Sequence, residues 1–562
     1  MIDTRAPSLP AQLVTRSESP RVAVLFSERL TSVFDLTELR DWLQTTLPTV
    51  GVGIIASPDK QPEAIAETVA ALRAQRVVVA LASGEGSIPQ IQAQARKAGL
   101  DALGIEAFDL SARVAPGDSG PATIARAKLV LAAAVAKARA FPGSRPENVK
   151  GSMSVAMSRR ALFTLAIREY HSVPAVQVDR CGVDRGCHRC VDVCPQRALR
   201  VSDQRIELDK DLCGSCGVCV TACPSEALTF PGYSAGELDA QIATLLDPAI
   251  GDLAPRGILF VCRQTAGALD RAVARGFRHP AGWLPVTVPC AGSLSPTLFL
   301  RCLALGAAAV GVAGCLDQCG FRQGNDVVQR IAFTQELLHQ IGQPRDRVRF
   351  CSVGVDDPAV WALPVEASAI PPADLLARDS GPGAAGATAL LHLAATASAA
   401  AAPAAAAGVV PDVKLAHPQS PYGLVDIDAA GCTACEACTT VCPTGALAGG
   451  LEGGNVVISF DAALCVACGQ CLPRCPEAER NVLRLTRAVD VRRLSEGRVA
   501  IYRDATPHCE SCGAAIAPGA MMARIAELLG DDYGPLAATI ARYCSDCRGL
   551  PTALPTNGAV GR

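Results

Sequence analysis

The chain has 562 residues, a formal net charge of −2 and 26 cysteines. Such a balanced charge creates no long-range field that would favour nucleic acid or an anionic membrane, so we expect neither partner. A typical domain size of about 150 residues predicts roughly four domains. No cysteine precedes Cys181, and most of the later ones fall in groups of four. This pattern is typical of metal ligation in a reducing, cytoplasmic compartment rather than of a disulfide framework.

The first part of the chain predicts a parallel α/β domain over residues 21–165, because short β-branched runs alternate with helical segments. It follows a disordered lead-in, residues 1–20, which lacks the apolar core of a secretion signal. The expected strands are Arg21 to Phe26, Val50 to Ile55 and Arg76 to Ala82. The expected helices are Leu36 to Leu47, Pro62 to Ala74, Pro89 to Ala98 and Ala122 to Phe141.

Four segments of this domain carry a resemblance: Val77 to Ala80, Gln94 to Leu100, Ala122 to Lys137 and Ser158 to Arg160. Through them residues 20–165 resemble the N-terminal domain of the large flavoprotein subunit of heterodisulfide reductases. Ser27 and Ala82 stand where that family often carries cysteines, and the FAD-binding domain that follows in the family is missing from this chain.

Residues 166–235 predict a ferredoxin module with two 4Fe–4S clusters. The second of its cysteine runs has the spacing C-x2-C-x2-C-x3-C followed by proline, as in bacterial ferredoxins. Because the fourth cysteine of each run ligates the other cluster, the spacing assigns the ligands. Cluster 1 is expected on Cys181, Cys187, Cys190 and Cys223, and cluster 2 on Cys213, Cys216, Cys219 and Cys194.

The first run of this module is irregular. Asp184 stands where a cysteine is usual, and Cys181 lies further upstream than the regular spacing places it. One interpretation is an insertion loop that still delivers Cys181 to cluster 1, and the alternative is a 3Fe–4S centre. Zinc in place of iron is a third interpretation of such quartets, which the prolines after their last cysteines disfavour.

Residues 255–355 predict a second parallel α/β domain, with strands at Arg256 to Cys262, Leu284 to Cys290, Ala308 to Gly314 and Val348 to Val353, and helices at Ala266 to Gly276, Pro296 to Ala304 and Asn325 to Ile341. The carboxyl ends of parallel strands meet at one edge of a sheet, so cysteines at three strand ends can converge there on a further cluster. The candidate ligands are Cys262, Cys290, Cys315 and Cys319.

The motifs Val288 to Gly292 and Gly314 to Gly320 resemble the small iron–sulfur subunit of methyl-viologen-reducing hydrogenases. That resemblance implies a 2Fe–2S cluster and electron transfer between a hydrogenase and a heterodisulfide reductase. The alternative is that these cysteines are buried structural thiols, an interpretation that suits Cys302 and Cys351 best.

Residues 371–415 are rich in alanine, proline and glycine, which predicts a linker with a helical part at Thr388 to Thr396. A second ferredoxin module is expected over residues 420–485, with regular cysteine spacing. Cluster 3 is assigned to Cys432, Cys435, Cys438 and Cys475, and cluster 4 to Cys465, Cys468, Cys471 and Cys442.

Two C-x2-C pairs over residues 500–550 predict a zinc-ribbon-like domain around a helical middle, Met521 to Leu529. The expected zinc ligands are Cys509, Cys512, Cys544 and Cys547. A rubredoxin-like iron or a further cluster is the alternative, and His508 is an alternative ligand. Residues 420–550 are similar, more loosely, to iron–sulfur proteins associated with bacterial formate dehydrogenases.

The sequence shows no catalytic constellation, and its longest apolar run, Cys302 to Leu316, is shorter than the roughly 18 residues that span a bilayer. We therefore expect an electron-transfer subunit that relays single electrons within a redox complex. The expected partner is a hydrogenase, a formate dehydrogenase or a heterodisulfide-reductase-like flavoprotein. Two alternatives stay open at this point: an iron–sulfur cluster carrier or assembly factor, and a flavin-containing reductase.

Overall fold

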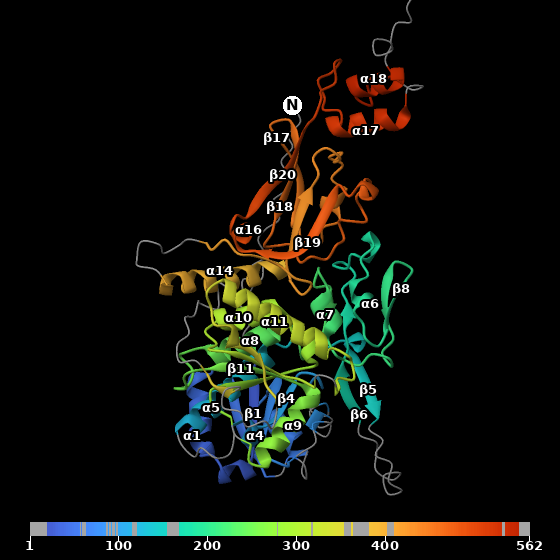
Figure 1. Ribbon diagram of the computed structural model, residues 1–562. Coiled ribbons are helices and arrows are strands. Elements are labelled where there is room, and N and C mark those ends of the chain that lie inside the picture. Colours follow the sequence, from blue (N-terminus) through green and yellow to red (C-terminus); the bar gives the residue numbers. More distant parts are fainter. Residues whose placement is uncertain are drawn as a thin grey trace, which may run out of the picture.

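The computed structural model describes residues 20–549, apart from 57, 59–62, 86–87, 89–90, 93–95, 97–98, 115–120, 154–167, 278, 316–317, 353–360, 364–380, 402–409 and 531–533. Figure 1 shows two α/β units at one end, a small cysteine-rich module beside them, and a second module that leads to the C-terminal helices at the far end. The expected lead-in and most of the expected helix at Pro89 to Ala98 lie outside the described residues.

The N-terminal α/β unit contains a parallel sheet, as expected, with a fourth strand that the sequence did not predict. The strand order is β2 (Val50–Ile55), β1 (Val22–Ser27), β3 (Arg76–Leu81) and β4 (Ile105–Asp109). Alternate residues of β1 face opposite sides, because successive side chains in a strand point in opposite directions. One side packs against α1 (Leu36–Thr46) and α5 (Pro121–Ala140), and the other against α2 (Glu63–Ala71). The short helix α4 (Leu110–Val114) leads on from β4.

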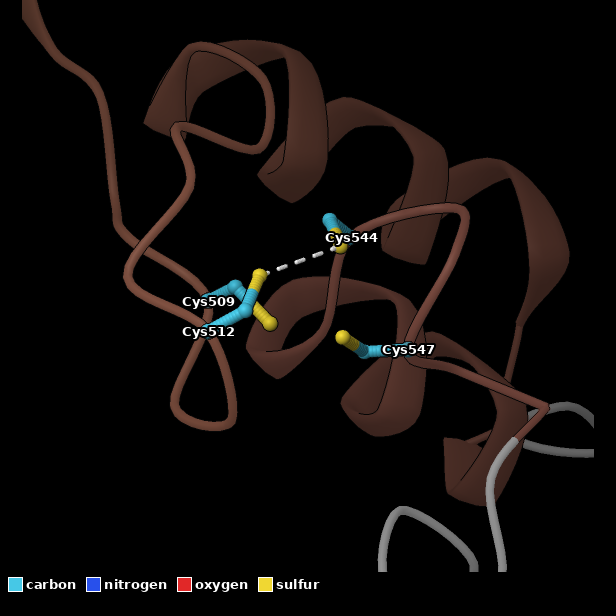
Figure 2. A group of neighbouring side chains, drawn as sticks. All are labelled: Cys509, Cys512, Cys544 and Cys547. Atoms are coloured by element: carbon cyan, nitrogen blue, oxygen red, sulfur yellow. Dashed lines mark hydrogen bonds between the residues drawn. The ribbon is translucent and has the colours of Figure 1, made fainter. Parts of the chain in front are cut away.

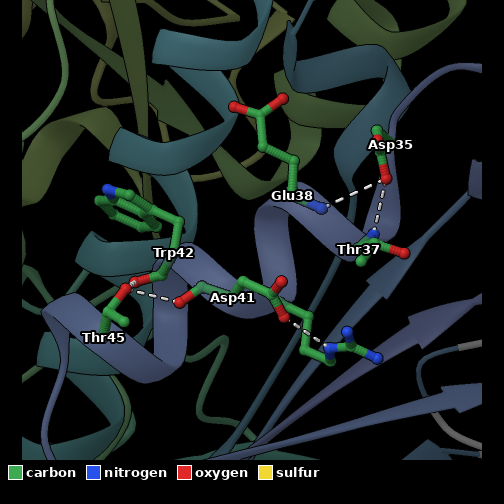
Figure 3. A network of polar contacts seen from close by, with 7 residues as sticks. Asp35, Thr37, Glu38, Asp41, Trp42 and Thr45 are labelled. Carbon is green, nitrogen blue, oxygen red and sulfur yellow. Dashed lines mark hydrogen bonds and ion pairs between the residues drawn. The ribbon is translucent and has the colours of Figure 1, made fainter.

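Helix α1 begins where an acidic side chain caps its free backbone groups (Figure 3). Asp35 Oδ1 accepts hydrogen bonds from the backbone N–H groups of Thr37 at 2.9 Å and Glu38 at 3.2 Å. Near the C-terminal end, Thr45 Oγ1 donates to the carbonyl oxygen of Asp41 at 2.6 Å. The N-terminal cap made by Asp35 is worth about 1 kcal/mol and fixes the start of the helix that covers the sheet.

The central α/β unit has the same topology, again with all its strands parallel. Its strand order is β12 (Trp283–Val288), β11 (Gly257–Cys262), β13 (Val310–Ala313) and β14 (Val348–Phe350). The helices that pack on it are α8 (Ala235–Leu246), α9 (Arg263–Ala274), α10 (Pro296–Ala304) and α11 (Gly324–Gln340).

The two α/β units share a buried interface. Leu129 and Ala133 of α5 belong to the same apolar core as Ile242 of α8. Arg126, also on α5, is fully buried and donates from Nη2 to the carbonyl oxygen of Trp283 at 2.8 Å. The units therefore form one body on which the cysteine-rich modules rest.

The first module, residues 149–153 and 168–230, consists of short antiparallel pairs and two short helices that carry cysteines. Its strands are β5 (Val149–Met153), which pairs with β6 (Arg168–Ser172), β7 (Ala175–Val176), which pairs with β10 (Leu228–Thr229), and β8 (Leu199–Ser202), which pairs with β9 (Arg205–Leu208). Its helices are α6 (Arg189–Asp192) and α7 (Val218–Ala222).

The second module, residues 414–505, has the same plan with longer strands. One sheet has the order β15 (Lys414–Ala416), β19 (Leu483–Asp490) and β16 (Gly423–Ile427), and the other β17 (Leu447–Glu452), β18 (Asn455–Asp461) and β20 (Arg498–Ala505). Its helices are α15 (Ala437–Thr440) and α16 (Val491–Ser495).

The alanine-rich segment before the second module contains the expected helical part, Thr388 to Thr396, but the helix is longer than expected and is packed into the core. Residues Gly381–Ala401 form one helix, α14, which packs on α10 and contacts α16. The side chains of Leu390 and Leu393 are 0% and 1% exposed, so the apolar face of α14 is part of the core. Composition alone misses this because alanine favours both helices and linkers, and tertiary burial decides between them. No helix within the described ranges is long and apolar enough to cross a bilayer.

Candidate metal centres

The structure brings together the four thiols assigned to cluster 1. Cys181, Cys187, Cys190 and Cys223 line one cavity between β7, β9 and β10. The irregular stretch after Cys181 forms a single turn, Val183–Arg185, and closes when the backbone N–H of Cys187 donates to the carbonyl oxygen of Gly182 at 3.0 Å. The extra residues are thus taken up in a loop, and Cys181 still reaches the cavity.

Backbone N–H groups point at the sulfur atoms of this cavity. The N–H of Val183 donates to Cys181 Sγ, and that of Arg189 donates to Cys187 Sγ. Ala227 donates to Cys223 Sγ at 3.2 Å. Burial raises the pKa of the Cys181 and Cys187 thiols, whereas these donors lower it. The donors favour the thiolate form, which is the form that ligates iron.

The thiols assigned to cluster 2 also lie together. Burial raises the pKa of the Cys219 thiol, and the nearby thiols of Cys216, Cys213, Cys190 and Cys194 raise it further. The backbone N–H of Ser215 donates to Cys213 Sγ, and the N–H of Ala198 donates to Cys194 Sγ at 3.3 Å. Ser215 has a φ of 54°, a left-handed conformation that bends the loop between Cys213 and Cys216.

In the second module the two assigned quartets line two separate cavities. One is lined by Cys432, Cys435, Cys438 and Cys475, and the other by Cys442, Cys465, Cys468 and Cys471. Ala434 and Ala467 repeat the left-handed conformation of Ser215, with φ values of 53° and 50°. Each of these two cavities, like that of cluster 1, is lined by four thiols. The same ligand set indicates the same kind of cofactor in all three.

The cysteines of the central α/β unit converge at one edge of its sheet. Cys290, Cys315 and Cys319 line a cavity of about 240 Å³, next to Phe350 at the end of β14. Cys262 does not line the cavity, but its thiol is hydrogen-bonded to that of Cys315 and lies 2.8 Å from Thr265 Oγ1. Burial and the Cys262 thiol raise the pKa of Cys315 to about 12.

Cys319 behaves differently from its neighbours in this group. Although burial opposes the change, the backbone N–H groups of Gln323 and Phe321 lower the pKa of its thiol. Cys302 and Cys351 are outside the group, and both side chains are fully buried in apolar surroundings.

The four thiols of the C-terminal segment form a compact group, shown in Figure 2, in which all sulfur atoms lie within 4.8 Å of one another. Cys512 Sγ lies 3.6 Å from Cys544 Sγ. A tetrahedron of sulfur atoms about 2.3 Å from a metal has edges of about 3.8 Å, so the spacing fits a single ion. The backbone N–H of Cys544 lowers the pKa of Cys509 to about 6. His508 does not belong to this group.

An ion pair joins the two segments that carry the cysteine pairs. Arg542 donates from Nη2 to Glu510 Oε2 at 2.5 Å and from Nε to Glu510 Oε1 at 2.7 Å. Between the pairs the chain forms helices α17 (Gly519–Leu529) and α18 (Gly534–Arg542), and within the described residues a single isolated bridge joins His508 to Ala515 on either side of the first pair. Helix α17 contains the helical middle expected at Met521 to Leu529, where the residues are strong helix formers.

Comparison with known proteins identifies the central unit. Residues 258–367 match the family described as methyl-viologen-reducing hydrogenase, delta subunit. The vhu iron–sulfur subunit of the F420-non-reducing hydrogenase of Methanococcus voltae is 37% identical over 101 residues, which are 75% of that protein and 17% of this chain. The chain belongs to this delta subunit family. We refer to residues 258–367 as the delta-subunit domain.

Two further segments of this delta-subunit family member, residues 180–227 and 431–479, each match a 4Fe–4S dicluster domain. The iron–sulfur subunit of the F420-non-reducing hydrogenase of Archaeoglobus profundus is 33% identical over 98 residues, 72% of its length and 17% of this chain. Formate hydrogenlyase subunit 2 of Escherichia coli K12 is 36% identical over 63 residues, 31% of its length and 10% of this chain. The expected iron–sulfur character and both ferredoxin modules are confirmed, whereas the resemblance of residues 20–165 to a flavoprotein subunit stays a prediction.

Sequence reasoning missed residues that act near these centres without ligating a metal. Glu477 lines the cavity of Cys432 and Cys475, and its backbone N–H donates to Cys475 Sγ. Arg189 lines the cavity of cluster 1. The position of Glu477 two residues after a cysteine was the only signal in the sequence, since N–H donors to sulfur recur at that offset.

Proposed function

We propose that this chain is the electron-transfer subunit of a redox complex and holds four 4Fe–4S clusters, one 2Fe–2S cluster and one zinc ion. The observation that carries the proposal is the grouping of cysteines from separate segments around common cavities. In the first module, for example, Cys223 joins Cys181 although 42 residues separate them by subtraction of their numbers. Such crossed ligation is what a two-cluster ferredoxin requires.

The residues present suit 4Fe–4S clusters. The cavities are lined mainly by thiols and apolar side chains, with a few polar residues such as Glu477 and Arg189, and backbone N–H groups are directed at the sulfur atoms. A bound cluster accepts and releases one electron at a potential set by burial, charge and N–H···S bonds. The protein's part is to hold the ligands rigidly and to keep water away from them.

The fifth group lies in the delta-subunit domain, where its thiols are contributed by the ends of strands and the loops that follow them. The resemblance to the hydrogenase subunit implies a 2Fe–2S cluster at this place. We assign the 2Fe–2S cluster to Cys290, Cys315, Cys319 and Cys262. The alternative of purely structural thiols explains the buried Cys302 well, but it does not account for four thiols at one sheet edge.

The C-terminal group supports a structural zinc site. Four thiols at tetrahedral spacing leave no coordination position for a substrate, which is typical of structural rather than catalytic zinc. The relatives are subunits of hydrogenases and of a formate hydrogenlyase by name. We therefore propose a hydrogenase, a formate dehydrogenase or a related flavoprotein as the partner, in the cytoplasm.

Metal analysis of anaerobically purified protein tests this function. We expect about 18 iron atoms per chain for four 4Fe–4S clusters and one 2Fe–2S cluster, matching acid-labile sulfide, and about one zinc. Iron near zero with several zinc ions would overturn the proposal. Stoichiometric flavin would favour a reductase. Transfer of clusters to an acceptor protein without redox cycling would favour a carrier, although crossed ligation from separate segments holds the clusters against release.

A further inference from the structure

The five cysteine groups proposed above are neighbours in an unbroken series. Thiols of adjacent groups lie close enough to interact electrostatically, which requires one group to face the next. The pairs are Cys290 with Cys216, Cys219 with Cys190, Cys187 with Cys468, and Cys471 with Cys438. Two of these pairs lie within a ferredoxin module, where the fold itself requires them. The other two cross between parts of the chain.

The first crossing joins the delta-subunit domain to the first module. Cys290 and Cys216 belong to one buried apolar cluster, against which Phe321 packs. Thr221 Oγ1 donates to the carbonyl oxygen of Ser293 at 2.7 Å. Arg263 donates from Nη2 to the carbonyl oxygen of Gly214 at 3.2 Å, between two cysteines of cluster 2. The seam is apolar near the thiols and fixed by hydrogen bonds beside them.

The second crossing joins the two ferredoxin modules. Arg474 of the second module donates from Nε to the carbonyl oxygen of Arg185 at 3.2 Å, in the loop between Cys181 and Cys187. Burial lowers the pKa of Arg487, and the positive charge of Arg189 lowers it further, so the two charges lie on the same side of this junction. The loops that face each other are therefore flanked by positive charge.

The delta-subunit domain holds the second module in this position. His417 stacks beside Phe333 of α11 with ring centroids 5.2 Å apart, and Arg330 Nε donates to Gln419 Oε1 at 3.3 Å. Helix α14 adds the buried Leu390 and Leu393 between α10 and the second module. These contacts place the module independently of the single hydrogen bond of Arg474.

We propose that the delta-subunit domain and helix α14 fix the two ferredoxin modules with the Cys187 loop facing the Cys468 loop, which joins the five groups into one relay. The order is the delta-subunit group, cluster 2, cluster 1, cluster 4 and cluster 3. The inference rests on the proposed function. Each transfer oxidises one group by one electron and reduces its neighbour by one, with no bond broken and no proton moved.

A charge inversion at the junction tests this order. Arg474→Glu replaces a positive by a negative charge on the second module, next to the Arg185 loop of the first. A negative charge disfavours addition of an electron, so the midpoint potential of cluster 1 should become more negative. The matched control is Arg503→Glu, an equally exposed inversion on β20 of the same module, where Arg503 pairs with Glu452 at 2.8 Å.

The potentials are measured by redox titration with EPR detection in a background that lacks the second module's clusters, Cys435→Ser with Cys468→Ser. A shift with Arg474→Glu and none with Arg503→Glu supports the junction. Equal potentials in both variants overturn it while iron and sulfide in the first module still support the proposed function. If the double variant Cys435→Ser with Cys468→Ser fails to fold, the junction is tested instead by amide hydrogen exchange of residues 182–190 in the chain with all its cysteines. Arg474→Glu then increases exchange there, and unchanged exchange overturns the junction.

Discussion

Arg524 of helix α17 lies 3.1 Å from Glu477, measured from Nε to Oε1, and Glu477 lies on the wall of the cavity assigned to cluster 3. The same carboxylate pairs with Arg480 at 3.1 Å. Hydrogen bonds from these two arginines hold the pKa of Glu477 below its usual range, so it is ionised at neutral pH. The C-terminal helices are thereby connected to the end of the proposed relay.

Glu477→Gln should raise the midpoint potential of cluster 3, because it removes a negative charge from the cavity wall. The expected shift is on the order of tens of millivolts at an effective dielectric constant of about 20. Redox titration with EPR detection measures it. Glu479→Gln, which removes an exposed carboxylate two residues away, is the control and should leave the potential in place. Equal potentials in the two variants would show that Glu477 does not tune the centre.

Cys181→Ser should alter cluster 1 alone, since Cys181 is the one ligand that the irregular loop delivers to its cavity. The EPR spectrum of one cluster should change and the iron content should fall, while the other clusters keep their signals. Cys302→Ser removes a fully buried thiol outside every group and should lose no iron. A Cys181→Ser protein with unchanged iron and spectrum would contradict four-thiolate ligation of cluster 1.

Removal of zinc should unfold the C-terminal helices. Cys544→Ser breaks the tetrahedral thiol group, and structural zinc sites contribute folding free energy directly. Zinc content should drop by about one per chain, and amide hydrogen exchange should increase in α17 and α18. Ser545→Ala, at the exposed neighbouring position, is the control. Full zinc content in the Cys544→Ser variant would contradict the zinc assignment. Iron in place of zinc at this site of the parent protein would contradict it too.

Helix α14 should contribute to the stability of the whole assembly. Leu393→Ala removes a side chain that is 1% exposed and should lower the free energy of unfolding by about 2–5 kcal/mol. Thr388→Ala, on the exposed side of the same helix, should cost little. Thermal unfolding under anaerobic conditions compares the two. Equal stability would mean that the segment behaves as the linker that its composition indicates.

His279 should make stability depend on pH. Burial lowers its pKa to about 3 from an ordinary value of 6.5, and the nearby charge of Arg126 adds to the effect, while its ring stacks on Trp361. The unfolded chain therefore binds the proton more strongly, and stability falls as pH drops from about 6.5 towards the folded pKa, by roughly 1.4 kcal/mol per pH unit.

Unfolding measured between pH 7.5 and about pH 5 checks this dependence. His279→Gln should flatten the curve in that window relative to the parent protein. His339→Gln, at an exposed position on α11, should leave the slope as it is. Parallel curves for all three proteins would show that His279 does not cause the acid sensitivity.

The sequence alone predicts those parts of the fold that depend on local patterns. Buried runs such as Val22 to Phe26 identify the sheets because they are continuous, apolar and followed by helical segments. The C-x2-C spacing similarly predicts which thiols the structure brings together, because the short loops between these cysteines allow few arrangements around a 4Fe–4S cluster.

What the sequence could not predict depends on contacts between distant residues. The sequence predicts a helix only for Thr388 to Thr396, whereas the full length and the core position of α14 depend on burial of Leu390 and Leu393. The contact of Arg474 with Arg185 joins residues 289 positions apart, which no local pattern encodes. The bond of Arg126 to Trp283 unites the two α/β units in the same non-local way.

The central claim is that the chain carries electrons, and a reductive titration tests it most directly. Anaerobic protein with full iron content is titrated with a one-electron reductant while visible absorption and EPR are recorded. We predict an uptake of about five electrons per chain, one for each proposed cluster, fully reversible on reoxidation. Uptake near zero, or reduction that releases the iron, would contradict the account.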